Sequence, residues 1–190
     1  MKRFMKYKVL IVSVLMMASL TGCDKGDGEA DYGSAYIYMP QSMVSGGLNS
    51  NYAVPAGGGT MTYNFKVNAN KDLDIILGVL KSGKFASNDG YSVNVAVDDA
   101  KTTAALAGIA SSIAMPSTMY TLPSSVTVPD GETGTGFYLT VDADALKLAA
   151  YTGKKLVLAV GLTSTNKYEL AATNVNTIVV IDVNAIRAFL

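Results

Sequence analysis

The sequence predicts an all-β protein, an antiparallel β-sandwich of about seven to nine strands with one or two short helical insertions. Three observations predict this fold class. Apolar and polar residues alternate in several short segments, as they do in strands with one buried face. Turn signals rich in Gly, Pro, Asn and Asp separate these segments. Of the 190 residues, 49% are hydrophobic and only 16% are charged, so the chain is able to bury a substantial core.

About eight segments are expected to form strands. Residues 61–67 alternate most clearly and predict one buried face. Its members are Met61, Tyr63, Phe65 and Val67. The turn Pro129-Asp130-Gly131 follows a later strand, because Pro presets φ and Gly accepts a positive φ. In chain order, the expected strands are residues 36–39, 61–67, 73–80, 91–97, 125–128, 137–141, 156–162 and 177–183.

Two segments interrupt the β pattern and are expected to be helical. Residues 102–113 are rich in Ala and place three apolar side chains on one helical face. These are Leu106, Ile109 and Ile113. Residues 144–150 are expected to form a short helix with Asp144 as its N-cap.

The expected strand at residues 156–160 is apolar at every position. A strand with one bare face alternates, whereas a strand covered on both faces need not. We therefore expect the longer helical insertion to cover the outer face of a sheet.

The N-terminus has the parts of a secretory signal. Four basic residues within the first eight precede an apolar run over 9–20, and small residues then lead to Cys23. A helix of these 12 apolar residues spans about 18 Å, less than the roughly 30 Å of membrane hydrocarbon. Leu20-Thr21-Gly22-Cys23 resembles the lipobox of bacterial lipoproteins, in which the cysteine becomes the first mature residue and carries the lipid.

We therefore expect residues 1–22 to be a lipoprotein signal peptide and residues 23–34 to be the lipidated Cys23 with a flexible acidic tether. Residues 35–190 are expected to form a single β-sandwich domain. The alternative for the apolar run is a buried core helix, and for Cys23 a buried thiol. The acidic residues after Cys23 resemble the surface-export signal of Bacteroidetes lipoproteins, and a solvated spacer is the alternative.

Composition excludes several classes of function. Removal of residues 1–22 takes away four of the 15 Lys and Arg residues and none of the 15 Asp and Glu residues, leaving a net charge of −4. A nucleic-acid partner is not expected, because such proteins need a basic footprint. The chain has no His and one Cys, which excludes a Ser-His-Asp triad, a His-ligated metal and an intramolecular disulfide. No cofactor and no metal site are expected.

Carboxylate pairs are the remaining route to an enzyme. The pairs are Asp72 with Asp74, Asp98 with Asp99, Asp130 with Glu132, and Asp142 with Asp144. Each follows or precedes an expected strand, where Asp is favoured because its side chain bonds local backbone amides. We favour this turn role over catalysis. Calcium bound between residues 98–99 and 142–144 is a further alternative.

Aromatic residues give an ambiguous signal for sugar binding. The chain has no Trp, and Tyr63 and Tyr91 are expected in the core. Four other tyrosines lie in loop-like contexts, where they form a sugar-stacking platform or cover the edge of the core. They are Tyr32, Tyr52, Tyr151 and Tyr168.

From Tyr36 to Asp182, the order of several segments resembles a Bacteroidetes module known as domain of unknown function 1735. These segments are residues 36–40, 52–55, 73–78, 119–123, 126–131 and 155–160. The resemblance implies an immunoglobulin-like sandwich. It also implies that the chain corresponds to a module that often forms the N-terminal part of cell-surface lipoproteins in glycan-utilisation systems, including some family 18 endoglycosidases. The family offers no catalytic residues to carry over.

The sequence and this resemblance together predict a non-catalytic lipoprotein of the outer membrane, exposed at the cell surface. We expect an accessory or glycan-binding module with a glycan or another surface protein as partner, and with Cys23 as its one assigned site residue. A periplasm-facing orientation is the alternative location. A structural or adhesive protein is the alternative function, in which the apolar tail 185–190 pairs with a sheet edge of another chain. The tail packs on its own core if that alternative is wrong.

Overall fold

A computed structural model of the chain describes residues 35–43, 51–83 and 89–190. The expected signal peptide, Cys23 and the tether lie outside the described residues, so these predictions stay predictions. Within the part of the chain that is described, no helix is both long enough and apolar enough to span a membrane.

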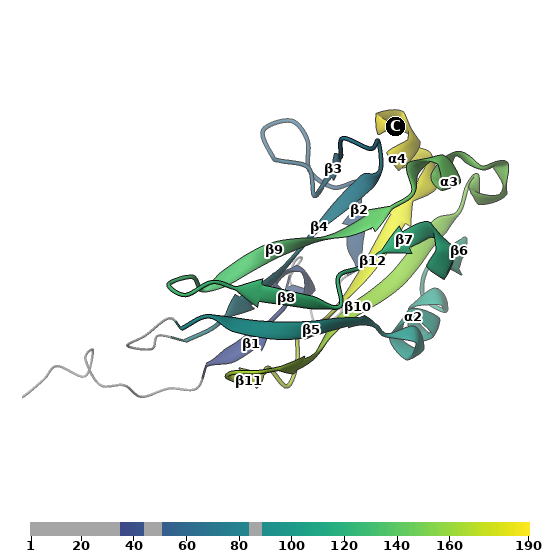
Figure 1. Cartoon of the computed structure of the whole chain (residues 1–190). Coiled ribbons are helices and arrows are strands. Elements are labelled where there is room, and N and C mark those ends of the chain that lie inside the picture. Colours follow the sequence, from purple (N-terminus) through teal and green to yellow (C-terminus); the bar gives the residue numbers. More distant parts are fainter. Residues whose placement is uncertain (1–34, 44–50, 84–88) are drawn as a thin grey trace, which may run out of the picture. The chain divides into compact units, whose positions relative to one another are not determined.

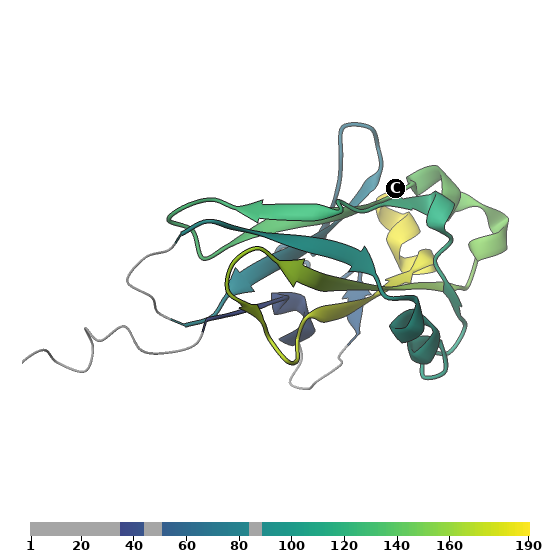
Figure 2. The same cartoon turned by 60° about the horizontal axis from the view of Figure 1, so that its bottom comes forward.

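The described residues form an all-β, immunoglobulin-like sandwich of two six-stranded sheets (Figure 1, Figure 2). Sheet A has the order β11-β1-β4-β9-β7, with β3 also paired to β4. Its strands are β1 (Tyr36–Tyr38), β3 (Phe65–Val67), β4 (Leu73–Lys81), β7 (Tyr120–Thr121), β9 (Gly134–Val141) and β11 (Glu169–Leu170). Sheet B has the order β2-β12-β10-β5-β8, with β6 also paired to β10. Its strands are β2 (Tyr52–Val54), β5 (Tyr91–Val97), β6 (Ser112–Ala114), β8 (Ser125–Val128), β10 (Lys155–Thr165) and β12 (Asn176–Asp182).

All the expected strand segments contain strands, and the sandwich is confirmed. The four additional strands, β2, β6, β7 and β11, have only two or three residues each. Segments this short carry little readable alternation, and these four are not predicted from the sequence. Three of them, β2, β6 and β11, pair in parallel with a neighbour, whereas the long strands pair antiparallel.

The prediction for residues 61–67 is wrong in its first half. Only Phe65–Val67 form a strand, and Phe65 is buried while Met61 is 70% exposed and Tyr63 is 38% exposed. The cause is a turn in which Gly58 and Met61 exchange backbone hydrogen bonds of 2.9 and 3.2 Å. Because this turn lies outside the sheet, its alternating pattern marks no buried face.

The longer helix, α2 (Asp99–Leu106), begins and ends earlier than expected. Ile113 belongs instead to β6, which pairs in parallel with β10. The expectation that this insertion covers a sheet is confirmed through Thr102, whose buried hydroxyl accepts a hydrogen bond from the backbone N–H of Ala159 in β10 at 2.9 Å. Every residue over Leu156–Val160 is buried, as the apolar run predicts.

Asp142, and not Asp144, caps the second helix, α3 (Ala143–Lys147). Its Oδ1 accepts hydrogen bonds from the backbone N–H groups of Asp144 at 2.8 Å and Ala145 at 3.0 Å. The sequence places two aspartates at this helix start, and the one before the first turn satisfies the free amides.

The C-terminal tail packs on its own core. It forms α4 (Val183–Ile186) and the 3₁₀ turn η4 (Arg187–Phe189), and Ile186 is fully buried. Arg187 donates hydrogen bonds to the carbonyls of Leu146 and Leu148 at 2.8 and 2.7 Å and to the hydroxyl of Thr152 at 2.8 Å. The other 3₁₀ turns are η1 (Pro40–Met43), η2 (Ser117–Met119) and η3 (Ala149–Tyr151).

Candidate functional site

The register of sheet A aligns four polar residues in one row across its outer face. The row runs from β3 through β4 and β9 to β7 and consists of Lys66, Asp74, Thr140 and Thr121. Leu73 and Ile75 lie in the core, so the alternation of the strand turns Asp74 outward. Because directly opposed side chains are about 4.5–5.5 Å apart at Cβ, these four groups are neighbours. We call them the polar row.

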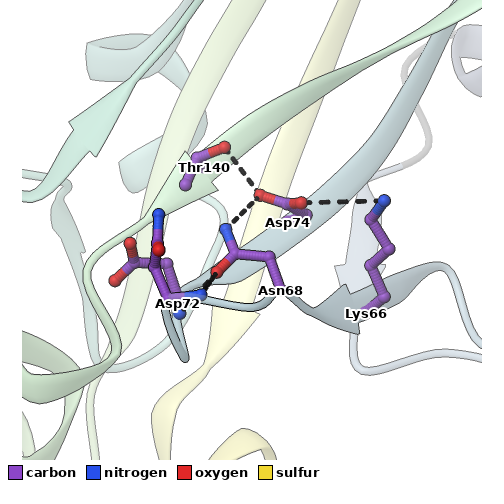
Figure 3. A network of polar contacts seen from close by, with 6 residues as sticks. Lys66, Asn68, Asp72, Asp74 and Thr140 are labelled. Atoms are coloured by element: carbon purple, nitrogen blue, oxygen red, sulfur yellow. Dashed lines mark hydrogen bonds and ion pairs between the residues drawn. The ribbon is translucent and has the colours of Figure 1, made fainter.

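Asp74 is the centre of the polar row and is only 7% exposed. Its Oδ1 accepts hydrogen bonds from Thr140 Oγ1 at 2.7 Å and from Asn68 Nδ2 at 3.1 Å. Its Oδ2 lies 3.8 Å from Lys66 Nζ, whose side chain is half exposed (Figure 3). A buried carboxylate needs such partners to offset its lost hydration. Asp74 therefore fixes the orientation of Thr140 and draws Lys66 over the sheet.

The turn between β3 and β4 holds Asn68 in place. Asn68 Oδ1 accepts hydrogen bonds from the backbone N–H groups of Asn70 at 2.9 Å and Asp72 at 3.0 Å. Lys71 completes the turn with a φ of 67°, the left-handed region. The amide nitrogen of Asn68 is thus aimed at Asp74, while Asp72 is held at the rim of the sheet (Figure 3).

Tyr138 adds a partly exposed aromatic ring beside the polar row. It lies two residues before Thr140 on the same face of β9 and is 41% exposed. Lys66 Nζ lies 4.0 Å from the centre of its ring, a cation–π contact. The face thus combines an aromatic surface with charged and hydroxyl groups.

A shallow pocket of about 210 Å³ opens at the end of the polar row. It is lined by Asp72, Thr118, Met119, Tyr120, Thr121, Thr140 and Asp142. Typical pockets for drug-sized ligands hold roughly 300–1,000 Å³, so this one suits a single sugar ring or another small polar group. Burial raises the pKa of the Tyr120 hydroxyl, and the charge of Asp99 adds to this effect.

One aspartate in each of three expected carboxylate pairs accepts hydrogen bonds from backbone amides, as the turn interpretation predicts. Asp98 caps α2 by accepting from the N–H of Lys101 at 2.9 Å, and Asp142 caps α3. Asp130 accepts from the N–H of Gly90 at 2.5 Å. Asp74 is the exception, because it lies within a strand and bonds side chains.

Asp72 and Asp74 make different hydrogen bonds, and the described residues hold no carboxylate cluster suited to a metal ion. The Asp74 carboxylate contacts Thr140, Asn68 and Lys66, and Figure 3 marks no contact between it and Asp72. Among the described residues, no three acidic or Cys side chains gather as a set that is able to hold a metal ion. Residues 98–99 and 142–144 therefore do not converge into a calcium site there.

The tyrosines divide differently from the sequence prediction. Tyr91 is buried as expected, and its hydroxyl donates to the carbonyl of Thr133 at 3.1 Å. Burial raises the pKa of Tyr91 to about 12, with smaller contributions from Tyr168 and Tyr38. Tyr63, expected in the core, is partly exposed.

The loop-context tyrosines do not form a common platform in the described part of the chain. Tyr52 donates its hydroxyl to the carbonyl of Ile76 at 2.9 Å, and the Tyr168 ring packs edge-on against Tyr91. Tyr151 is half-buried against the core, and Tyr32 lies outside the described residues. Tyr138 is not predicted as a site residue, although its place between the buried Phe137 and Leu139 marks it as outward-facing.

A family model described as a "-like, N-terminal domain" matches residues 48–169, well over half of the chain. No curated protein matches the chain. Two Bacteroides ovatus structures of unknown function are similar at TM-scores of 0.54 and 0.51. The first is 8% identical, and the match covers 80% of this chain and 52% of that structure's chain. The second is 15% identical, and the match covers 77% of this chain and 45% of that structure's chain. At these identities the likeness shows the fold.

A Bacteroides ovatus multidomain protein including DUF1735 is also similar, at a TM-score of 0.45 and 15% identity. The match covers 67% of this chain and 43% of that protein. The chain thus spans about half the length of the solved structures it matches.

Proposed function

The chain belongs to the Bacteroidetes family of DUF1735-type modules, and we propose that it is a non-catalytic cell-surface lipoprotein that binds glycans. The binding surface is the outer face of sheet A, where the polar row, Tyr138 and the adjacent pocket meet. Cys23 carries the lipid that attaches the chain to the outer membrane.

One observation carries the proposal of glycan binding. The exposed ring of Tyr138 lies on the same face as Lys66 and Thr140, and Thr140 also lines the pocket of hydroxyls and carboxylates. A sugar ring has an apolar face of C–H groups that packs on an aromatic ring, and a rim of hydroxyls that needs donors and acceptors. Both kinds of group are present here within one sheet face.

The non-catalytic role is supported by how the carboxylates are used. Asp98, Asp130 and Asp142 accept hydrogen bonds from backbone amides, and Asp74 is buried among side chains. A glycosidase needs one carboxyl group as acid and a second as nucleophile or base across the scissile bond. We propose that these carboxylates position the chain and the ligand and take no part in bond cleavage.

Calorimetric titration with host and plant glycans tests the proposed binding. The chain carries Cys23→Ser, which leaves no lipid to interfere. Tyr138→Ala is expected to weaken binding about three- to tenfold, as the loss of an aromatic contact of about 1 kcal/mol implies. Tyr36→Ala is the matched control, because Tyr36 is 38% exposed in β1 of the same sheet. Absence of binding to every glycan, or equal losses in both variants, would refute the proposal.

The adhesive alternative, motivated by the apolar run 178–181 and the tail 185–190, loses the support of the tail. The tail 185–190 is helical at its start and pinned by Arg187, so it is not an extended strand that is available to another chain.

A further inference from the structure

We propose that the pocket beside the polar row selects the uncharged, hydrogen-bond-donating end of a glycan, a neutral hexose, and rejects sugars that carry a carboxylate or sulfate. This inference rests on the proposed function and names the class of sugar that the site takes. It follows from the fixed acceptors and the negative charge of the pocket wall.

Thr140 presents only acceptor capacity to the pocket. Its hydroxyl has one proton and two lone pairs, and the proton is donated to Asp74 Oδ1 at 2.7 Å. Asp74 is held for this purpose by Asn68 from the turn and by Lys66 from β3. Because Asp74 is buried and fixed, the Thr140 hydroxyl has no freedom to turn its proton toward a ligand.

The two carboxylates of the pocket wall are acceptors as well. Asp142 Oδ1 already receives two amides of α3, and Asp72 is held by the Asn68 turn with its side chain at the pocket. None of the residues that line the pocket is Lys or Arg. Lys66, the cation of the polar row, faces Asp74 Oδ2 and the Tyr138 ring at 3.8 and 4.0 Å.

The fixed acceptors of the pocket wall, Thr140, Asp72 and Asp142, therefore favour ligand groups that supply protons. Sugar hydroxyls donate to Thr140, Asp72 and Asp142, and the hydroxyls of Thr118, Tyr120 and Thr121 are the donors for the sugar's own acceptors. A carboxylate or sulfate has no proton to donate and would face the like charges of Asp72 and Asp142. The acceptors of the pocket wall that it faces would then be left without a hydrogen bond. The site thus discriminates by unmet hydrogen bonds and by charge together.

Matched sugars test the selectivity. Calorimetry on the Cys23→Ser chain compares gluco-, galacto- and manno-configured oligosaccharides with uronate oligosaccharides of the same configuration and length. The neutral member of the series that binds is expected to bind at least about tenfold more tightly than its uronate. Asp72→Asn supplies an amide donor in place of an acceptor and is expected to reduce that ratio to below about threefold.

Thr140 variants separate a specific role from a general loss of structure. Thr140→Val is expected to weaken neutral binding about tenfold, and Thr140→Ser, which keeps the hydroxyl, is expected to restore it. A uronate that binds as tightly as its neutral partner would overturn the inference, as would a Thr140→Val chain with unchanged affinity. Failure of every neutral and every uronate sugar to bind refutes the proposed function itself, whereas binding with the opposite preference refutes only the selectivity.

Discussion

The bond between Thr102 and Ala159 gives the sharpest stability prediction. On one edge of β10, pairing with β5 ends at Val160, and pairing with β6 begins only at Val157. Ala159 lies in this gap, fully buried, and its N–H donates to Thr102 Oγ1. Thr102 Oγ1 donates in turn to the carbonyl of Asp98 at 2.9 Å. The Thr102 hydroxyl of α2 thus accepts the hydrogen bond that a neighbouring strand would otherwise accept from the N–H of Ala159.

Thr102→Val keeps the shape of the side chain and removes the hydroxyl. The buried N–H of Ala159 is then left without a partner, which costs about 1–3 kcal/mol, and the bond to Asp98 is lost at about 1 kcal/mol. We expect a total loss of about 2–4 kcal/mol in the free energy of unfolding. For a domain of this size that corresponds to a fall of roughly 5–15 °C in Tm.

Urea unfolding followed by circular dichroism measures this change. Thr103→Val is the matched control, because Thr103 is exposed in the next position of the same helix and should change stability by less than about 0.5 kcal/mol. Thr102→Ser should retain most of the stability. Equal stability of Thr102→Val and Thr103→Val would refute the role of Thr102 in completing sheet B.

Three further predictions concern the core, the tail and the anchor. The pKa of Tyr91 is about 12 in the folded chain and about 10 in the unfolded chain, so the unfolded chain ionises first as the pH rises and the folded state loses stability above pH 10. Between pH 9 and 11, the unfolding free energy of wild type should fall by about 1.4 kcal/mol more than that of Tyr91→Phe in urea titrations, and parallel pH profiles would contradict this. Arg187→Ala should lower the unfolding free energy by about 2–3 kcal/mol through loss of its three hydrogen bonds, measured by thermal unfolding against Lys154→Ala, and equal midpoints would contradict it. Cys23→Ser should move the protein from the membrane to the soluble fraction with an unchanged Tm, since the anchoring acyl chains contribute about 0.8 kcal/mol per buried CH₂; a mutant that stays membrane-bound after a high-salt wash would show that residues 9–20 act as an uncleaved anchor.

Alternation predicts the long strands because it records which side chains face the core. It fails where alternating residues lie outside the sheet, as Met61 and Tyr63 do in and after a turn. It also fails at Ile113, because the helical spacing continues past the point where pairing with β10 takes over. Tertiary pairing in each case overrides the local pattern.

The site is harder to predict from the sequence than the fold. Alternation alone turns Asp74 and Thr140 toward the outer face of their strands, and Tyr138 with them. Their proximity depends on the register between β4 and β9, which joins residues 66 positions apart in the chain. The spacing between the two strands does not encode that register, so the polar row emerges only from the three-dimensional structure.

The location of the glycan site is tested most directly by nuclear magnetic resonance. A neutral oligosaccharide is titrated into the ¹⁵N-labelled Cys23→Ser chain, and the backbone amide shifts are mapped onto the two sheets. We predict saturable shifts confined to the polar row, Tyr138, Asp72 and the pocket residues of β7, with none on β8 or the outer face of β5. Saturable shifts centred on β5 and β8, or no shifts with any neutral sugar, would contradict glycan binding at the outer face of sheet A.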